Sequence, residues 1–218
     1  SNSAFEYGAP VALPNPSGLH ARPAAVLAAE AKKFSSDIRL MRGEESANAK
    51  SVVAIMGLST RQNDLITVSA SGPDARPAIN CISRLLSTGC GEEAGDAPEA
   101  PAPASAVRSH PADANELAGV SASPGLAVGR IAQYRQQLID VVETGDSPER
   151  ERARFNAAVH DSRSAIEALK ETLSDPAKAQ ILDAHIELLG DPDLLDLVIE
   201  SISAGKSAGF AWRAAFTR

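Results

Sequence analysis

The sequence has few aromatic residues, few cysteines and no long apolar run. Phe, Trp and Tyr make up 4% of the 218 residues, so any core must be built from alanine and aliphatic side chains. No stretch approaches the ~18 apolar residues of a membrane-spanning helix, and no N-terminal segment has the apolar region of a secretory signal. The two cysteines, Cys81 and Cys90, lack the spacing of a disulfide framework. Reduced thiols and a cytoplasmic location are therefore expected.

Basic residues are not in excess either. Residues 1–92 carry 9 Lys and Arg against 8 Asp and Glu, residues 93–117 carry 1 against 5, and residues 118–218 carry 11 against 15. Nucleic-acid binding needs clustered positive charge, so we expect no nucleic acid among the partners, and no direct membrane insertion. A near-neutral first region followed by an acidic one favours contact between complementary protein surfaces.

The heptapeptide GLHARPA, residues 18–24, has the features of an anion-binding helix terminus. It places His20 where a strand-like run gives way to an alanine-rich helix, and Arg22 follows two residues later. Free N–H groups and a partial positive charge at a helix N-terminus attract phosphate. His20 and Arg22 are therefore the catalytic candidates, with Ser17 and Ala21 cradling the phosphate. The alternative is a loop histidine that only helps to cap the helix.

Two motifs occur in order in this region, NPSGLHARPA at residues 15–24 and ANAKS at residues 47–51. On these motifs, residues 5 to about 90 resemble HPr, the histidine-containing phosphocarrier of the bacterial phosphoenolpyruvate-dependent sugar phosphotransferase system. The resemblance implies that His20 accepts a phosphoryl group on Nδ1 from Enzyme I and passes it to a IIA domain.

The residue pattern itself predicts an α+β fold, an HPr-like two-layer open-faced β-sandwich, because all helices need the same sheet face. Strands are expected over Phe5–Leu13 and Leu65–Ser71, with Ile38 and Leu40 alternating with polar residues in a third strand that turns back through a fourth. The expected helices are Ala21–Phe34, Val52–Met56 closed by Gly57, and one between Asp74 and Gly89.

Ser51 is predicted to be the N-cap of the short helix, worth about 1 kcal/mol. In some bacterial lineages the equivalent HPr serine is phosphorylated by an ATP-dependent kinase, so the resemblance also makes Ser51 a regulatory phosphorylation site. Val52, Val53 and Met56 are unusually apolar for a short surface helix. They are expected either in the underlying core or, for one or two of them, at the apolar centre of a docking patch.

Composition divides the rest of the chain. Residues 1–4 are interpreted as a vector-derived tail, so the native protein is expected to begin further upstream. Residues 93–117 form an Ala/Pro-rich linker after the phosphocarrier domain at 5–92. Residues 118–146 are expected to be a strand segment, because AGVSASPGLAVG at 118–129 resembles the N-terminus of Enzyme I. Its sheet partners are expected to be missing from this chain.

The last region, residues 147–218, is predicted to be a helical subdomain. Ser147-Pro148, Asp175-Pro176 and Asp191-Pro192 each combine a capping residue with a proline at the first helical position. Apolar residues at intervals of four and three after Pro148 indicate a long bundle helix. Ser207 is expected to start a last helix that continues to Arg218.

DAHIELLGDPDL, at residues 183–194, resembles the subdomain through which Enzyme I docks HPr. The docking residues implied are His185, Leu188, Asp191 and Asp193, although a structural role for His185 is favoured. The family's own phosphorylated histidine has no counterpart here, so this incomplete Enzyme I region is expected to be unable to use phosphoenolpyruvate. No cofactor or metal is expected, because magnesium with phosphoenolpyruvate belongs to the missing barrel.

The favoured interpretation is a phosphoryl relay within a multiphosphoryl transfer protein, in which HPr is fused to Enzyme I, commonly in a fructose-specific system. The partners expected are Enzyme I, in cis or in trans, and the IIA domain of a sugar permease. The alternatives are a regulatory HPr-like module that acts through partner binding, and a purely structural helix bundle that would explain only residues 147–218.

Overall fold

The computed structural model describes residues 4–92, 129–130 and 139–217. Residues 4–92 and 141–217 belong to one compact unit. The linker expected at 93–117 and most of the strand segment expected at 118–146 lie outside the described residues. No helix of the described ranges is long and apolar enough to cross a membrane.

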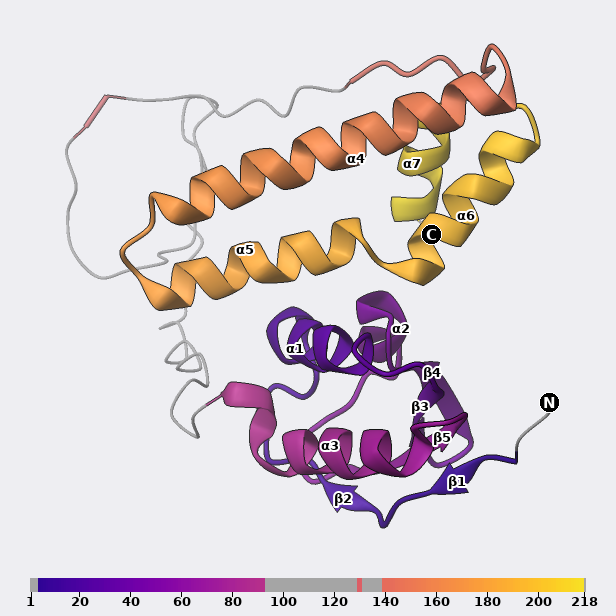
Figure 1. Cartoon of the computed structure of the whole chain (residues 1–218). Coiled ribbons are helices and arrows are strands. Elements are labelled where there is room, and N and C mark those ends of the chain that lie inside the picture. Colours follow the sequence, from indigo (N-terminus) through magenta and orange to yellow (C-terminus); the bar gives the residue numbers. More distant parts are fainter. Residues whose placement is uncertain (1–3, 93–128, 131–138, 218) are drawn as a thin grey trace, which may run out of the picture. The chain divides into compact units, whose positions relative to one another are not determined.

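An antiparallel sheet covered by helices forms the N-terminal region (Figure 1). The sheet order is β1-β5-β3-β4, with β2 also pairing with β5. In chain order the elements are β1 (Glu6–Tyr7), β2 (Val11–Ala12), α1 (Ala21–Ala31), β3 (Asp37–Arg42), β4 (Glu45–Asn48), α2 (Val52–Gly57), β5 (Leu65–Ser71), α3 (Ala75–Ser87) and the 3-10 turn η1 (Gly89–Gly91). The predicted α+β open-faced sandwich is confirmed.

Alternation along the strands decides which side chains enter the core. Ile38 and Leu40 of β3 are fully buried, whereas Asp37 and Arg39 between them are exposed. The buried strand residues form one cluster with the alanine and leucine face of α1, of which Leu27 is completely buried. Most of the buried face of α1 is alanine, so small side chains fill much of this core.

The expected first strand, Phe5–Leu13, is broken into β1 and β2. Tyr7 pairs with Ser69, but Val11 pairs with Ile66, so one extra residue stands on the first strand between the two pairs. This is a bulge, and Pro10 lies within it because proline has no N–H to donate to a ladder. The single strand predicted over this range was therefore wrong.

Two helix ends also differ from the prediction. Gly57 was expected to follow α2, but it is the last residue of the helix and Leu58 is the C-cap. The left-handed residue comes later, at Ser59, with a φ of 48°. The last helix stops at Phe216 with Thr217 as its C-cap, so it does not continue to the end of the chain as expected.

The C-terminal region is helical, and α4 and α5 form a hairpin that is continued by two shorter helices (Figure 1). The elements are α4 (Pro148–Glu171), α5 (Pro176–Leu189), α6 (Pro192–Ser203) and α7 (Ala208–Phe216). The predicted caps are confirmed, because the side chains of Ser147, Asp175, Asp191 and Ser207 each accept from backbone N–H groups of the helix they precede.

A small second core joins α4, α6 and α7. Phe155 packs with Val198 and Ile202, and its ring lies 5.8 Å from that of Trp212 between centroids. The buried carboxylate of Glu151 accepts hydrogen bonds from the backbone N–H groups of Asp146 and Ala208. One side chain of α4 therefore holds both the segment that enters α4 and the first turn of α7.

Candidate phosphoryl-acceptor site

The loop before His20, which is held against Thr60, sets the position of the histidine. Gly18 has a φ of +68°, and a Cβ at this position would lie 1.9 Å from the carbonyl oxygen of Thr60, so only glycine fits. The next residue, Leu19, donates its N–H to Oγ1 of Thr60 at 2.8 Å. His20 follows as the N-cap of α1, and its carbonyl accepts the N–H of Ala24 at 3.0 Å.

The side chain of His20 faces a carboxylate from the far end of the same domain. Nε2 of His20 lies 2.8 Å from Oε1 of Glu92, and a guanidinium nitrogen of Arg22 lies 3.5 Å from the same oxygen. Asn15 donates through Nδ2 to Oε2 of Glu92 at 2.8 Å and to the carbonyl of Gly89 at 2.9 Å. The imidazole remains 37% exposed, so a phosphoryl donor can approach it.

The predicted phosphate cradle would consist of backbone at the start of α1. The first-turn N–H groups there belong to Ala21 and Arg22, since Pro23 has none. Ser17 is exposed in the turn that precedes His20. An imidazole nitrogen, backbone N–H groups at a helix start and a guanidinium are groups that can accept a phosphoryl group and stabilise its oxygens. The roles assigned to these residues stay predictions.

A pocket of about 440 Å³ adjoins this site, lined among others by Arg22, Cys90, Glu92 and Glu187. Burial, with the charge of Glu92 as a second cause, raises the pKa of the Cys90 thiol to about 12. This thiol therefore stays protonated at neutral pH and is not a candidate nucleophile.

Ser51 and Asp191, assigned separately from the sequence, are in contact. The hydroxyl of Ser51 donates to Oδ1 of Asp191 at 3.0 Å, and Oδ2 of Asp191 accepts the N–H of Val53 at 3.2 Å. Oδ1 also accepts from the N–H groups of Asp193 and Leu194 in the first turn of α6. One buried carboxylate therefore caps the N-termini of both α2 and α6.

Further contacts surround this pair. Asn48 donates through Nδ2 to Asp193 at 3.0 Å, and Lys32 forms an ion pair with Glu187 at 2.7 Å. Ala184 of α5 is 3% exposed and belongs to the core cluster of the phosphocarrier region. The positive and polar groups of the first region thus meet acidic groups of the second, as the uneven charge distribution suggested.

The other predicted docking residues fall in different places. Val52 is fully buried in the core, whereas Val53 and Met56 are 40% and 42% exposed. Leu188 packs against the core cluster that contains Ala184. His185 is exposed and lines a separate groove with residues of α4 and α7, and its role stays a prediction.

Sequence reasoning missed Asn15 and Glu92, although both contact the histidine site. Glu92 is 72 positions from His20, and no local pattern connects an acidic residue near a domain end with a distant loop. The one available signal is the run of glycines around Cys90. Gly89, Cys90 and Gly91 all have positive φ, which turns the chain back toward α1.

Comparison with known proteins agrees with the fold. Residues 9–88 match the family described as the PTS HPr component phosphorylation site, and residues 118–218 match the N-terminal domain of PEP-utilising enzymes. The matches define an HPr-type domain followed by a region similar to the N-terminal domain of PEP-utilising enzymes. The chain belongs to the HPr family of phosphotransferase-system components, here joined to an Enzyme I-type N-terminal region.

Three relatives show how much of this chain and of each relative is matched. The phosphocarrier protein HPr of Buchnera aphidicola is 45% identical over 36% of this chain and 92% of its own length. A multiphosphoryl transfer protein of Rhodobacter capsulatus is 32% identical over 84% of this chain, but only 23% of its own length is covered. The phosphoryl donor subunit DhaM of a PEP-dependent dihydroxyacetone kinase from Klebsiella michiganensis is 30% identical over 93% of this chain and 40% of its own length. The chain thus spans less than half of the longer relatives.

Proposed function

We propose that His20 carries a phosphoryl group that it receives from the phosphohistidine of Enzyme I and passes to a IIA domain. The observation that carries the proposal is the placement of His20 at the N-terminus of α1, within the segment that matches the family's phosphorylation site. Phosphorylation on Nδ1 is favoured, because Nε2 faces the carboxylate of Glu92.

The transfer is a displacement at phosphorus. The Nδ1 lone pair of His20 forms the new N–P bond while the N–P bond of the donor breaks, and the bonding electrons return to the donor imidazole. Charge spreads over the three equatorial oxygens in a loose transition state. Arg22 and the N–H groups of Ala21 and Arg22 stabilise these oxygens, because they are fixed donors at the point where the charge collects.

The proposed loading partner is an Enzyme I surface of the kind formed by residues 147–218, in this chain or in another molecule. The contacts of Ser51 with Asp191 and of Asn48 with Asp193 support this role, because they join the two regions through polar groups. Val53, one of the apolar residues expected to dock, also joins the two regions, because its backbone N–H donates to the carboxylate of Asp191.

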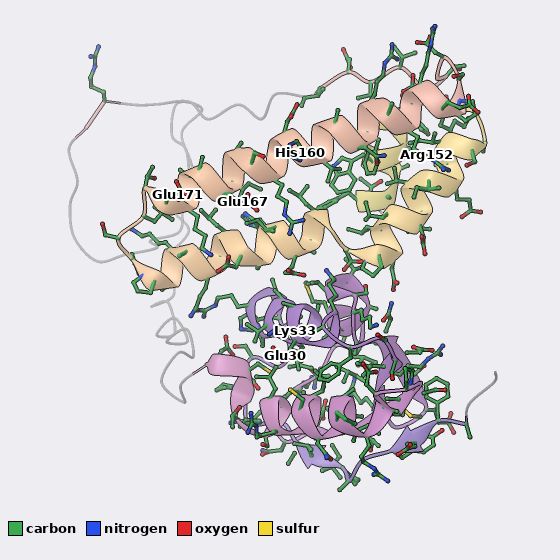
Figure 2. The ribbon with its side chains drawn as sticks, viewed as in Figure 1. Glu30, Lys33, Arg152, His160, Glu167 and Glu171 are labelled. Atoms are coloured by element: carbon green, nitrogen blue, oxygen red, sulfur yellow. The ribbon has the colours of Figure 1, made fainter. Side chains whose placement is uncertain are left out.

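The test is phosphate transfer with purified components. The chain is incubated with phosphoenolpyruvate, magnesium and a catalytic amount of intact Enzyme I, and acid-labile phosphate is located by peptide mapping. Label on His20 is expected only when Enzyme I is present, since this chain is proposed to be unable to use phosphoenolpyruvate alone. His20→Ala should abolish the label, whereas His160→Ala, on the exposed face of α4 (Figure 2), should leave it unchanged.

Two other outcomes would redirect the proposal. Label without Enzyme I would show that the chain loads itself. A chain that binds Enzyme I but takes no label would support the regulatory alternative, in which the HPr fold acts through partner binding.

The acceptor is either a IIA domain of a sugar permease or the donor machinery of a dihydroxyacetone kinase. The second candidate rests on the similarity to DhaM over 93% of this chain. Presenting the phosphorylated chain with fructose-type IIA and dihydroxyacetone-type IIA domains in parallel distinguishes them by which domain gains phosphate. Either route operates in the cytoplasm, and the free thiols of Cys81 and Cys90 fit that reducing compartment.

A further inference from the structure

Glu92 is held against the acceptor histidine although it lies beyond the segment that matches the HPr family. Three successive positive φ angles, at residues 89–91, turn the chain back, and the N–H of Glu92 donates to the carbonyl of Gly89 at 3.1 Å. The carboxylate of Glu92 is only 10% exposed. Asn15 fixes its Oε2 with a hydrogen bond of 2.8 Å, so its Oε1 points to His20.

Oε1 of Glu92 is buried, and none of the described residues has a donor aligned on it well enough for a hydrogen bond. Nε2 of His20 lies 2.8 Å from it. No hydrogen bond joins the two atoms, so the contact acts through charge. A carboxylate this close to Nε2 favours the tautomer that carries its proton there, because an N–H group is positive and a lone pair is negative.

We propose that Glu92 is a positioning residue that keeps the Nε2 proton of His20 in place and so leaves the lone pair on Nδ1 as the attacking atom. A neutral imidazole carries its proton on one nitrogen and its lone pair on the other, so fixing one nitrogen determines the role of the other. This role rests on the proposed function of His20 as phosphoryl acceptor.

The charge of Glu92 has a second effect during transfer. When the Nδ1 lone pair forms the N–P bond, the ring keeps its Nε2 proton and becomes positive, and the carboxylate at 2.8 Å offsets that charge. When the phosphoryl group leaves, the bonding electrons return to Nδ1 and the ring is neutral again. The same carboxylate repels a phosphoryl group from Nε2, where the two anions would collide. Glu92 thus selects the nitrogen that is phosphorylated.

The test uses phosphoramidate, a small donor that phosphorylates histidine without Enzyme I. The whole chain and its Glu92→Ala and Glu92→Gln variants are treated with it, and the two phosphohistidine isomers of His20 are separated by ³¹P and ¹⁵N NMR. The wild-type chain should give the Nδ1 isomer. Glu92→Ala should raise the share of the Nε2 isomer about tenfold, because the negative charge beside Nε2 is lost. Glu92→Gln, which keeps the shape without the charge, should lie between them.

Glu44→Gln is the matched control, because Glu44 is an exposed glutamate in the turn between β3 and β4. It should leave the isomer ratio unchanged. An unchanged ratio in Glu92→Ala, in a domain whose NMR spectrum shows it to be folded, would overturn the proposal, as would the Nε2 isomer in the wild-type chain. If the isomer ratios follow the prediction but Enzyme I labels none of the chains, the relay function fails while the positioning by Glu92 stands.

Discussion

At the scale of single residues, the loop before His20 depends on Gly18. Its φ of +68° disfavours any side chain, and a Cβ would also lie 1.9 Å from the carbonyl oxygen of Thr60. Gly18→Ala should therefore destabilise the phosphocarrier region by more than the ~1 kcal/mol of left-handed strain alone, because the loop must move away from Thr60. The free energy of unfolding in urea measures the effect.

Gly43→Ala separates the cost of a left-handed φ from the cost of the contact with Thr60. Gly43 has a nearly equal φ of +60°, but a Cβ there meets nothing within 4 Å. It should show the left-handed cost alone, and the difference between the two variants should be the cost of the contact with Thr60. Equal losses in both variants would mean that this contact does not hold the loop.

Reactivity of the cysteines gives a second prediction at this scale. Burial raises the pKa of the Cys81 thiol, and its contact with the Glu30 carboxylate raises it further. Less thiolate is then present at pH 8 than in a free cysteine, so alkylation is slow. Glu30→Gln should increase the alkylation rate of Cys81 several-fold, while Cys90, with a pKa of about 12, stays unreactive. Mass spectrometry of iodoacetamide-treated peptides measures both rates.

The control for this variant lies in the turn that follows α1. Glu30 on α1 also pairs with Lys33 of that turn at 2.6 Å (Figure 2). Lys33→Gln breaks that ion pair but keeps the carboxylate beside the thiol, so it should not accelerate alkylation as Glu30→Gln does. A faster reaction of Cys81 in Lys33→Gln alone would contradict the account.

At the scale of elements, Glu151 links the first turns of α4 and α7. Hydrogen bonds from the backbone N–H groups of Ala208 and Asp146 lower the pKa of this carboxyl group from its ordinary value of 4.5. A carboxyl group whose pKa is lower in the folded state contributes stability above its unfolded pKa, and the contribution disappears as the pH falls through the folded value. Glu151→Gln should therefore lower the Tm at pH 7, and the gap to the wild type should narrow below pH 4.5.

Glu149→Gln is the comparison, because Glu149 lies in the same turn of α4 but is exposed. Its variant should unfold close to the wild-type Tm at neutral pH. A Glu151→Gln gap that keeps the same size from pH 7 to pH 3 would show that lost packing, and not the charge, causes the destabilisation.

Elements with local signals were predicted well from the sequence. The starts of α4, α5 and α6 follow from a capping side chain and a proline, which act within one helical turn. The break between β1 and β2 was missed because the pairing register with β5 depends on residues far along the chain. Pro10 was the one local signal that disfavours a continuous strand. The site residues also differ in how local their sequence signal is. His20 and Arg22 lie in one motif, whereas Asn15 meets Glu92 across 77 positions.

At the scale of the whole molecule, the contact of Ser51 with Asp191 determines whether the two regions stay together. Both residues are completely buried, and the Asp191 carboxylate already accepts from Ser51, Val53 and the first turn of α6. A second negative group at residue 51 would face this carboxylate without water between them, which is strongly unfavourable. Phosphorylation of Ser51 and the contact with Asp191 therefore exclude each other.

Ser51→Asp places the charge permanently and should separate the two regions. ¹⁵N relaxation of the whole chain measures this, because regions in contact share one rotational correlation time and separated regions tumble faster. Ser46→Asp adds the same charge at an exposed position of β4 and should leave the common tumbling intact. Ser51→Ala removes the hydroxyl without adding charge, so it should weaken the contact less than Ser51→Asp. Common tumbling in Ser51→Asp would mean that the remaining contacts, such as Lys32 with Glu187, hold the regions together without this pair.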